Sequence, residues 1–430
     1  MENKQTSVEH YDFKQLPRRA GRVFMYLTRS IVANVWARGQ KIRVKFHRME
    51  QLELPCLLLI THSSQLDFPV LFKAIKPHRI NVLASHSGMR DAGEFWLKRL
   101  GCLFKRTGVR ELNSLRQLRY CAEHYGDIVG IYPESHYSLD GTTDYLPESA
   151  AKIGRFLKLP VVTLRVNGTY LAQPQWSDHV RHTEIECEFT CIATKEEVTT
   201  LPPEEMMRRI KKGLSRDELA WQRDNHIVIS DKNRAKGLHH ILYRCPHCNT
   251  EFEMRSEETK IRCGHCGAEY EMTELGELSA LNGETKFSHI PDWVAWERRC
   301  IREEVRSGEY RFEDEVEVHS LPHYKKFIPQ GRGKFLHTKQ GMILDCNLYG
   351  KHERIVWASK DLEQLHIEFD YPTYKRKRKD NRFGDCFELS VPDDSYWIIP
   401  QTKRNCVMKL FLATEEIHQM LAPKRLTKAK

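Results

Sequence analysis

A histidine and an aspartate five positions apart form the first candidate catalytic pair. His62 comes two residues after the apolar run LPCLLLI, and Asp67 follows it. An imidazole with one ring nitrogen held by a carboxylate can act as a general base near neutral pH. The same spacing recurs twice, at His86/Asp91 and His226/Asp231. Chance produces this pattern about once in a chain so rich in both residues, so spacing alone identifies no site.

Two cysteine pairs form the second candidate site. Cys245 and Cys248 are separated by 14 residues from Cys263 and Cys266. Four thiolates in two C-x-x-C pairs match the tetrahedral ligand set of a structural Zn²⁺, with a redox dithiol as the alternative. The intervening TEFEMRSEETKIR alternates enough to predict a hairpin. These features predict a zinc ribbon over about 240–275 that gains folding free energy from its metal.

Composition limits the class of protein. A length of 430 residues is enough for two or three domains of about 150 residues each. The net charge of +10 indicates an anionic partner, whether phospholipid, nucleic acid or an acidic carrier protein. We find no apolar run near the ~20 residues that cross a bilayer, and no secretory signal at the N-terminus. With 13 cysteines and no evident disulfide framework, these features predict a cytoplasmic protein.

The elements that would position His62 alternate between two kinds. Short runs rich in Val, Ile and Leu predict buried strands, and helical patterns lie between them, so residues 1–235 are expected to form an α/β domain with a mixed, mostly buried sheet. His62 and Glu134 follow strand-like runs, where active-site groups of such domains lie. The expected strands lie at 54–60, 80–85, 127–133 and 159–168, and the expected helices at 67–75, 92–100, 111–126 and 203–225.

The stretch at 18–48 is strongly basic throughout, and its first part predicts an amphipathic helix with Phe24, Leu27, Ile31 and Val35 on one face. Such a helix can lie in the interface of an anionic membrane, or pack on its own domain.

Residues 288–430 predict a β-rich domain with a helix at each end, which resembles a pleckstrin-homology-like barrel without a sharp motif. Its basic run Tyr374–Lys379 is either a solvated loop or a contact for anionic lipid.

Residues 50–170 resemble the glycerolipid, lysophosphatidic-acid-type acyltransferase family in four ordered blocks. THSSQLDFP matches the first block, Asn-His-x-Ser-x-x-Asp, and GCLFKR resembles the second. YPESHYS resembles the third block, Phe-Pro-Glu-Gly-Thr-Arg-Ser, and LPVVTL the last. The resemblance selects His62 over the other two histidines and implies an acyltransferase in which Asp67 orients that base.

The resemblance also implies the substrates and their site. Acyl-CoA or acyl-carrier protein would donate the acyl group, and a lysophospholipid or related lysolipid hydroxyl would accept it. The implied acceptor site contains Arg106 as a phosphate ligand, with Lys105 or Arg110 assisting. The other substrate-binding residues carried over are Ser64, Pro133 and Glu134.

The third block departs from the family. Ser135, His136 and Tyr137 replace Gly, Thr and Arg, so an acceptor other than lysophosphatidic acid is compatible with the site. Thr61 replaces Asn, and the second block is one residue shorter before Arg106. The leading interpretation is an acyltransferase peripherally attached to the membrane. The alternative is an inactive zinc-ribbon regulatory protein recruited to anionic lipid or nucleic acid, although the ribbon carries several glutamates and nucleic acid is the less favoured ligand.

Overall fold

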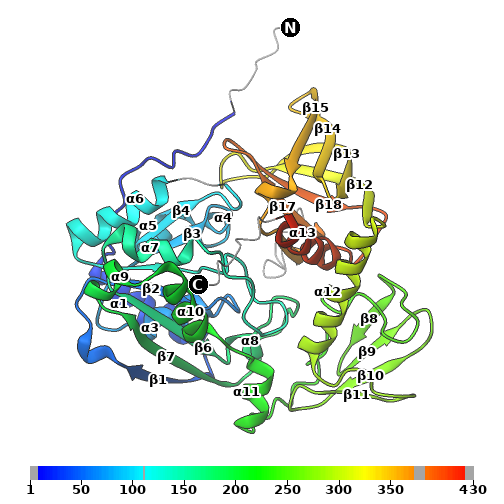
Figure 1. Cartoon of the computed structure of the whole chain (residues 1–430), viewed down its shortest axis with the longest axis horizontal. Coiled ribbons are helices and arrows are strands. Elements are labelled where there is room, and N and C mark those ends of the chain that lie inside the picture. The colour runs from blue at the N-terminus through cyan, green and yellow to red at the C-terminus, as the bar shows by residue number, and fades with distance from the viewer. Residues whose placement is uncertain (1–7, 110–111, 372–382, 422–430) are drawn as a thin grey trace, which may run out of the picture.

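The computed structural model describes residues 8–109, 112–371 and 383–421. An α/β unit occupies one side of the molecule, a small ribbon and a larger β-sheet occupy the other, and a long helix joins those two sheets (Figure 1). The basic run Tyr374–Lys379 and the residue Arg110 lie outside the described residues.

The α/β unit is built on a mixed seven-stranded sheet in the order β1-β7-β6-β2-β5-β3-β4. Strands β6, β2, β5, β3 and β4 are parallel, β7 is antiparallel to β6, and β1 lies parallel to β7 at the edge. The strands are β1 (Lys41–His47), β2 (Leu57–Ile60), β3 (Ile80–Ser85), β4 (Cys102–Lys105), β5 (Ile128–Ile131), β6 (Val161–Asn167) and β7 (Glu184–Ala193).

Helices cover both faces of this sheet. Alternate residues of β2 enter different cores, with Leu58 and Ile60 on one face and Leu57 and Leu59 on the other. This double burial explains the nearly continuous apolar run and confirms the expected mixed sheet flanked by helices. The helices are α3 (Asp67–Ala74), α4 (Met89–Ala92), α5 (Glu94–Arg99), α6 (Asn113–Tyr120), α7 (Ala150–Leu157), α8 (Thr169–Ala172), α9 (Lys195–Thr200), α10 (Pro203–Leu214) and α11 (Glu218–Asp224).

The basic N-terminal stretch is only partly helical. It forms α1 (Arg22–Leu27), a π-helical stretch (Thr28–Val32) and α2 (Ala33–Trp36), and then becomes strand β1. The helix expected in the first part of the stretch is confirmed between Arg22 and Trp36, and β1 then takes up the free edge of β7, pairing Lys41 to His47 with Glu184 to Thr190. Cations of β1 lie beside glutamates of β7, with Lys45 Nζ 2.7 Å from Glu186.

The predicted helix over 203–225 is interrupted. The chain is extended at Ser215 and Asp217, between α10 and α11, and Asp217 then accepts a hydrogen bond from the N–H of Ala220 as the N-cap of α11. Asp217 also forms a β-bridge with Thr142. The break allows the residue between them, Arg216, to turn into the α/β unit.

The cysteine pairs lie in a four-stranded antiparallel sheet, as the predicted hairpin suggested. Strands β8 and β9 form that hairpin, and β10 and β11 complete the sheet in the order β11-β10-β9-β8. The bounds are β8 (Met254–Glu257), β9 (Lys260–Cys263), β10 (Glu269–Met272) and β11 (Leu278–Ala280).

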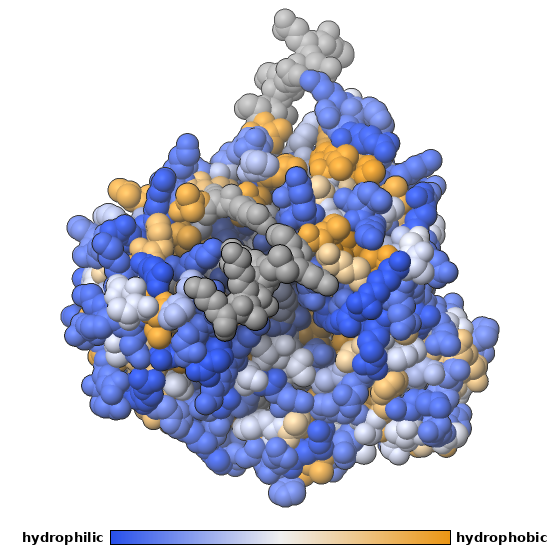
Figure 2. All heavy atoms as spheres, viewed as in Figure 1, coloured by the Kyte–Doolittle hydropathy of each residue, from blue (hydrophilic) through white to orange (hydrophobic). Residues whose placement is uncertain are grey.

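The C-terminal region is β-rich, as expected, with α12 (Ile290–Ser307) before its sheet and α13 (Val407–Leu421) after it. Its seven described strands are antiparallel in the order β15-β14-β13-β12-β18-β17-β16. They are β12 (Arg311–Ser320), β13 (Ile328–Thr338), β14 (Gly341–Leu348), β15 (Lys351–Ala358), β16 (His366–Tyr371), β17 (Gly384–Ser390) and β18 (Ser395–Pro400). Figure 2 shows hydrophobic residues gathered over this sheet on a face that is otherwise mostly polar.

One hydrophobic core runs through the ribbon, α12, the C-terminal sheet and α13. Cys263 and Tyr270 of the ribbon, Trp293 of α12 and Phe411 of α13 all belong to it. The same core also includes Tyr170 and Leu219 of the α/β unit, so the ribbon packs against both parts of the molecule.

Candidate active site and metal site

The predicted site residues follow neighbouring parallel strands at the carboxyl edge of the α/β sheet. His62 follows β2, Glu134 follows β5, and Arg106 follows β4. In open α/β sheets this edge is where ligands bind. The order β2-β5-β3-β4 places His62 beside Glu134 and about 14 Å, or three strand spacings, from the strand that carries Arg106.

His62 and Asp67 form the predicted pair. The Nδ1 atom of His62 lies 3.0 Å from Oδ2 of Asp67, and the His62 side chain remains 20% exposed. Asp67 is the first residue of α3 and is buried, and its Oδ2 also accepts the backbone N–H groups of Ser63 at 2.6 Å and Ser64 at 2.9 Å. These bonds suit an ionised carboxylate. With Nδ1 directed to Asp67, Nε2 is the ring nitrogen left for a substrate proton.

Glu134 and Arg216 hold the main chain of His62. Oε2 of Glu134 accepts the N–H of His62 at 3.1 Å, and Arg216 donates to the carbonyl of His62 at 3.1 Å. The two side chains also pair with each other through two bonds of 2.7 and 2.8 Å. Burial opposes the charge of Arg216, but the adjacent Glu134 outweighs it and raises the pKa of the guanidinium.

The loop after β5 encloses the ring of His62. The centroid of Tyr132 lies 4.1 Å from the imidazole in a stacked arrangement, and that of Tyr137 lies at 4.2 Å. The N–H of Ser138 donates to the carbonyl of His62 at 2.7 Å. Pro133 is buried between Tyr132 and Glu134, where it fixes the turn that brings the loop back over His62.

Ser64 has a structural role in the turn before α3. Its side chain is buried, and its Oγ accepts the N–H of Leu66 at 3.2 Å. Ser64 thus shapes the turn that carries His62 and Asp67. The hydrogen bond from the main chain accounts for the position of this hydroxyl without any contact to substrate.

Arg106 joins the two halves of the molecule. Its guanidinium donates to the carbonyls of Leu321, Pro322 and Asp393 at 3.3, 2.8 and 2.9 Å, and to Oγ of Ser395 at 3.3 Å. The resemblance assigned Arg106 to an acceptor phosphate, but a buried guanidinium that binds these C-terminal groups anchors the C-terminal sheet instead. Lys105 ends β4 and is half-buried beside it.

The other two histidines of the repeated spacing lie in different surroundings. His86 is buried beside Tyr11 and Phe13, and burial, reinforced by the charge of Arg106, lowers its pKa to about 3. His226 is exposed at the end of α11. His86 follows β3 at the same carboxyl edge as His62, but its side chain is buried, whereas that of His62 is 20% exposed and can be reached by a substrate.

Sequence patterns did not identify Arg216, Tyr132 or Tyr137 as parts of the site. Arg216 is 154 residues from His62 and lay inside a predicted helix. Tyr132 and Tyr137 flank PESH in the third block, and this position beside Glu134 was the one sequence feature that could have placed them near the site. Glu218 is a further buried acid next to this region: it accepts the N–H groups of Gly168 and Tyr170, and burial raises its pKa to about 7.

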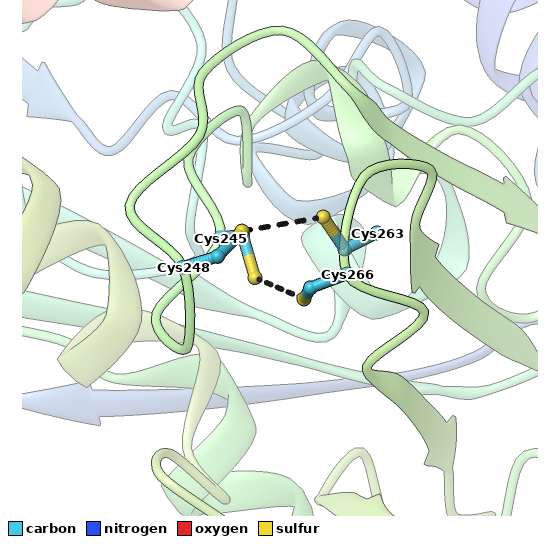
Figure 3. A group of neighbouring side chains, drawn as sticks. All are labelled: Cys245, Cys248, Cys263 and Cys266. Carbon is cyan, nitrogen blue, oxygen red and sulfur yellow. Dashed lines mark hydrogen bonds between the residues drawn. The ribbon is translucent and has the colours of Figure 1, made fainter.

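The four cysteines converge from two loops of the ribbon (Figure 3). Their sulfur atoms lie within 4.8 Å of one another, and Sγ of Cys245 is 3.6 Å from that of Cys266, while Sγ of Cys248 is 3.8 Å from that of Cys263. Tetrahedral coordination at the usual Zn–S length of about 2.3 Å gives S···S separations of about 3.8 Å. The donors and their spacing therefore fit a metal ion with no open coordination position.

No family model matches the chain, and no protein of curated function matches it. Among solved structures, it is similar to the crystal structure of the 1-acyl-sn-glycerophosphate (LPA) acyltransferase PlsC from Thermotoga maritima. That similarity has a TM-score of 0.34 at 15% sequence identity, and it covers 45% of this chain and 77% of the other.

Proposed function

We propose that this protein is an acyltransferase that moves a fatty acyl group from acyl-CoA or acyl-carrier protein to a hydroxyl of a lysophospholipid or related lysolipid. The observation that carries this proposal is the His62–Asp67 contact of 3.0 Å at the carboxyl edge of the sheet. It provides an oriented imidazole, and the Glu134–Arg216 pair fixes the backbone beneath it.

In the proposed reaction, Nε2 of His62 takes the proton of the acceptor hydroxyl as its oxygen attacks the thioester carbonyl carbon. Asp67 keeps the imidazole in the tautomer with hydrogen on Nδ1 and stabilises the imidazolium that forms. The C–O bond forms, the C–S bond breaks, and the proton passes to the departing thiolate. A base placed in this way contributes about 10²–10⁴-fold to the rate.

Acyl transfer from labelled acyl-CoA and acyl-carrier protein to a panel of lysolipids tests this proposal. His62→Ala should lose transfer by about 10²–10⁴-fold. His226→Asn is the matched control, because His226 shares the sequence spacing but is exposed, and asparagine tolerates its positive φ of 51°. Absence of transfer to every acceptor by the folded wild-type protein would favour the regulatory, non-enzymatic alternative.

We also propose that the protein associates peripherally with anionic membranes in the cytoplasm. The described residues include no helix long and apolar enough to span a bilayer. The predicted apolar helix face is divided: Phe24 and Leu27 are half-buried against the domain, while Ile31 and Val35 are exposed. A membrane-facing patch is supported by apolar residues on α1, the π-helical stretch, α2 and α5 that are all more than half exposed: Val23, Tyr26, Ile31, Val35, Phe95 and Trp96.

This patch, defined by those six residues, lies among cations. Phe24 packs on Trp96 at 5.2 Å and so ties α1 to α5, and the guanidinium of Arg99 lies 3.5 Å from the ring of Phe95. Apolar side chains beside arginines favour the interface of an anionic bilayer.

The proposal extends to the metal of the ribbon and to the fold of the C-terminal sheet. Zn²⁺ is the metal that Cys245, Cys248, Cys263 and Cys266 would hold, in a structural role, because four thiolates fill its coordination. The C-terminal sheet is proposed to be pleckstrin-homology-like: strands β12–β15 form one meander and β16–β18 another, β12 pairs with β18, and α13 follows.

A further inference from the structure

The loop that encloses His62 is attached on its other side to the C-terminal helices. His136 lies between Glu134 and Tyr137 in this loop, and its side chain is 7% exposed. Its Nδ1 donates to the carbonyl of Tyr137 at 2.9 Å, and its ring meets Phe411 of α13 edge-on at 4.9 Å. The departure from the family at residue 136 therefore forms a contact between the loop and α13.

Carboxylates and arginines surround the other nitrogen of this ring. Nε2 of His136 lies 3.8 Å from Asp144 and 3.9 Å from Oε1 of Glu415. Arg298 of α12 bonds Oε2 of Glu415 at 2.7 Å and lies 3.9 Å from Asp144. Three of the side chains, His136, Asp144 and Glu415, are close enough to share one ion, but Arg298 already supplies a cation to both carboxylates, which disfavours a divalent metal there.

The side chains around His136 include more acids than permanently charged cations. Asp144, Glu415 and Glu416 face Arg298 and Arg302, the latter bonded to Glu416 at 2.7 and 3.0 Å. The amide of Gln364 approaches Nε2 of His136 at 3.4 Å and is neutral. One proton on Glu415 or His136 would balance the charges, and burial, with the nearby Asp144, raises the pKa of Glu415 to about 8.

We propose that Glu415 and His136 are positioning residues through which α13 holds the loop that orients His62. The contacts run from Arg298 and Glu415 to His136, and from the next two residues of the loop, Tyr137 and Ser138, to the ring and carbonyl of His62. The C-terminal region thus helps to position the active-site loop. This inference rests on the proposed role of His62.

Loss of the balancing proton at alkaline pH leaves an unmatched buried negative charge beside His136. We expect the loop to loosen and the kcat of acyl transfer to fall as the pH rises through about 8. Glu415→Gln replaces the protonated carboxyl by a neutral amide, so its kcat should no longer fall over that range. Glu388→Gln is the matched control: it removes a buried acid of the C-terminal sheet, on β17, but leaves the charges around Glu415 and His136 unchanged, and should keep the alkaline fall.

A second readout separates this inference from the proposed function. The rate at which diethyl pyrocarbonate modifies His62, relative to exposed His226, can be followed by peptide mass spectrometry at pH 7 and pH 9. In the wild type this ratio should rise about tenfold, which corresponds to about 1.4 kcal/mol of lost loop stability. In Glu415→Gln it should stay constant.

The outcomes are distinct. If the ratio changes equally in wild type and Glu415→Gln, the coupling between α13 and His62 is refuted, whether or not the protein transfers acyl groups. If the ratio behaves as expected but His62→Ala keeps full transfer activity, the coupling stands and the catalytic role of His62 fails. His136→Gln should lower kcat about tenfold with little change in KM, because a loop displaced by a fraction of an ångström affects the reacting geometry more than binding.

Discussion

The guanidinium of Arg216 and the carboxylate of Glu134 form an ion pair, and neither side chain is exposed to solvent. Each of them also bonds the main chain of His62, one at its N–H and the other at its carbonyl. A pair of this kind has two separable effects, one on stability and one on the position of the imidazole.

Arg216→Met should destabilise the protein by about 3–5 kcal/mol, because it leaves a buried carboxylate without its partner. The double variant Arg216→Met/Glu134→Leu should recover most of that loss, since apolar groups of similar volume can replace a buried pair. It should not recover acyl transfer, because both bonds to the His62 backbone are gone. Urea unfolding and the transfer assay measure the two effects, and a double variant with wild-type activity would contradict the positioning role.

Asp67→Asn should lower kcat by about 10⁴-fold while the protein remains folded, because the amide can stabilise the wrong imidazole tautomer. Asp127→Asn serves as the control, since Asp127 is also buried but pairs with Arg19 at 3.4 Å. Steady-state kinetics with the best acceptor, together with circular dichroism, decide the matter. Equal losses in both variants would indicate general destabilisation.

Removal of the metal should destabilise more than the ribbon. Cys263 shares a core with α12, the C-terminal sheet and α13, so chelation should lower the unfolding temperature of the whole C-terminal half. Metal analysis should find one Zn²⁺ per chain and none in Cys263→Ser, whereas Cys300→Ser, outside the cluster and half-buried, should retain it. Unchanged melting after complete chelation would exclude a structural metal.

The exposed apolar patch formed by the N-terminal helical segment and α5 should bind anionic vesicles. Trp96→Ser should weaken sedimentation with phosphatidylglycerol vesicles about tenfold, since burial of a large apolar side chain contributes about 1.5–3 kcal/mol. Val356→Ser is the control: Val356 is 61% exposed, but on β15. Binding that depends on Val356 and not on Trp96 would place the membrane contact elsewhere.

The stability of the protein should fall as the pH rises from about 5 to 8. Burial raises the folded-state pKa of Glu415 to about 8, above the ordinary value of 4.5, so the folded protein holds a proton that the unfolded chain has already released. Each further pH step in this window therefore favours unfolding. The contribution is present below the unfolded pKa and absent above the folded one, and Glu415→Gln should reduce the slope in urea titrations at several pH values.

Local patterns predicted the parts of the fold that depend on nearby residues. The run around Leu57–Ile60 predicted a strand buried on both faces, and the hairpin between the cysteine pairs followed from alternation between two turns. The pairing of His62 with Asp67 was also predictable, because they are only five positions apart and a helix begins at Asp67.

Contacts between distant segments could not be predicted in this way. The helical pattern at 203–225 was correct on both sides of Arg216. The helix breaks at Arg216 because this side chain pairs with the buried carboxylate of Glu134, 82 residues away. Arg106 has the type and position of a phosphate ligand, and only the carbonyls of Leu321, Pro322 and Asp393 show its use. In both cases a buried charge is satisfied by a segment whose position depends on the completed fold.

The anchoring of Arg106 also sets an order of events during synthesis. Its partner Ser395 lies 289 residues later in the chain. At about 5–20 residues per second, the ribosome needs roughly 15–60 s to make that interval. Throughout this time the C-terminal segments that cover the carboxyl edge of the first sheet are missing. Arg106 and His86, which are buried in the complete fold, are not yet covered by them. Arg106 therefore gains these partners only after the C-terminal sheet has been synthesised.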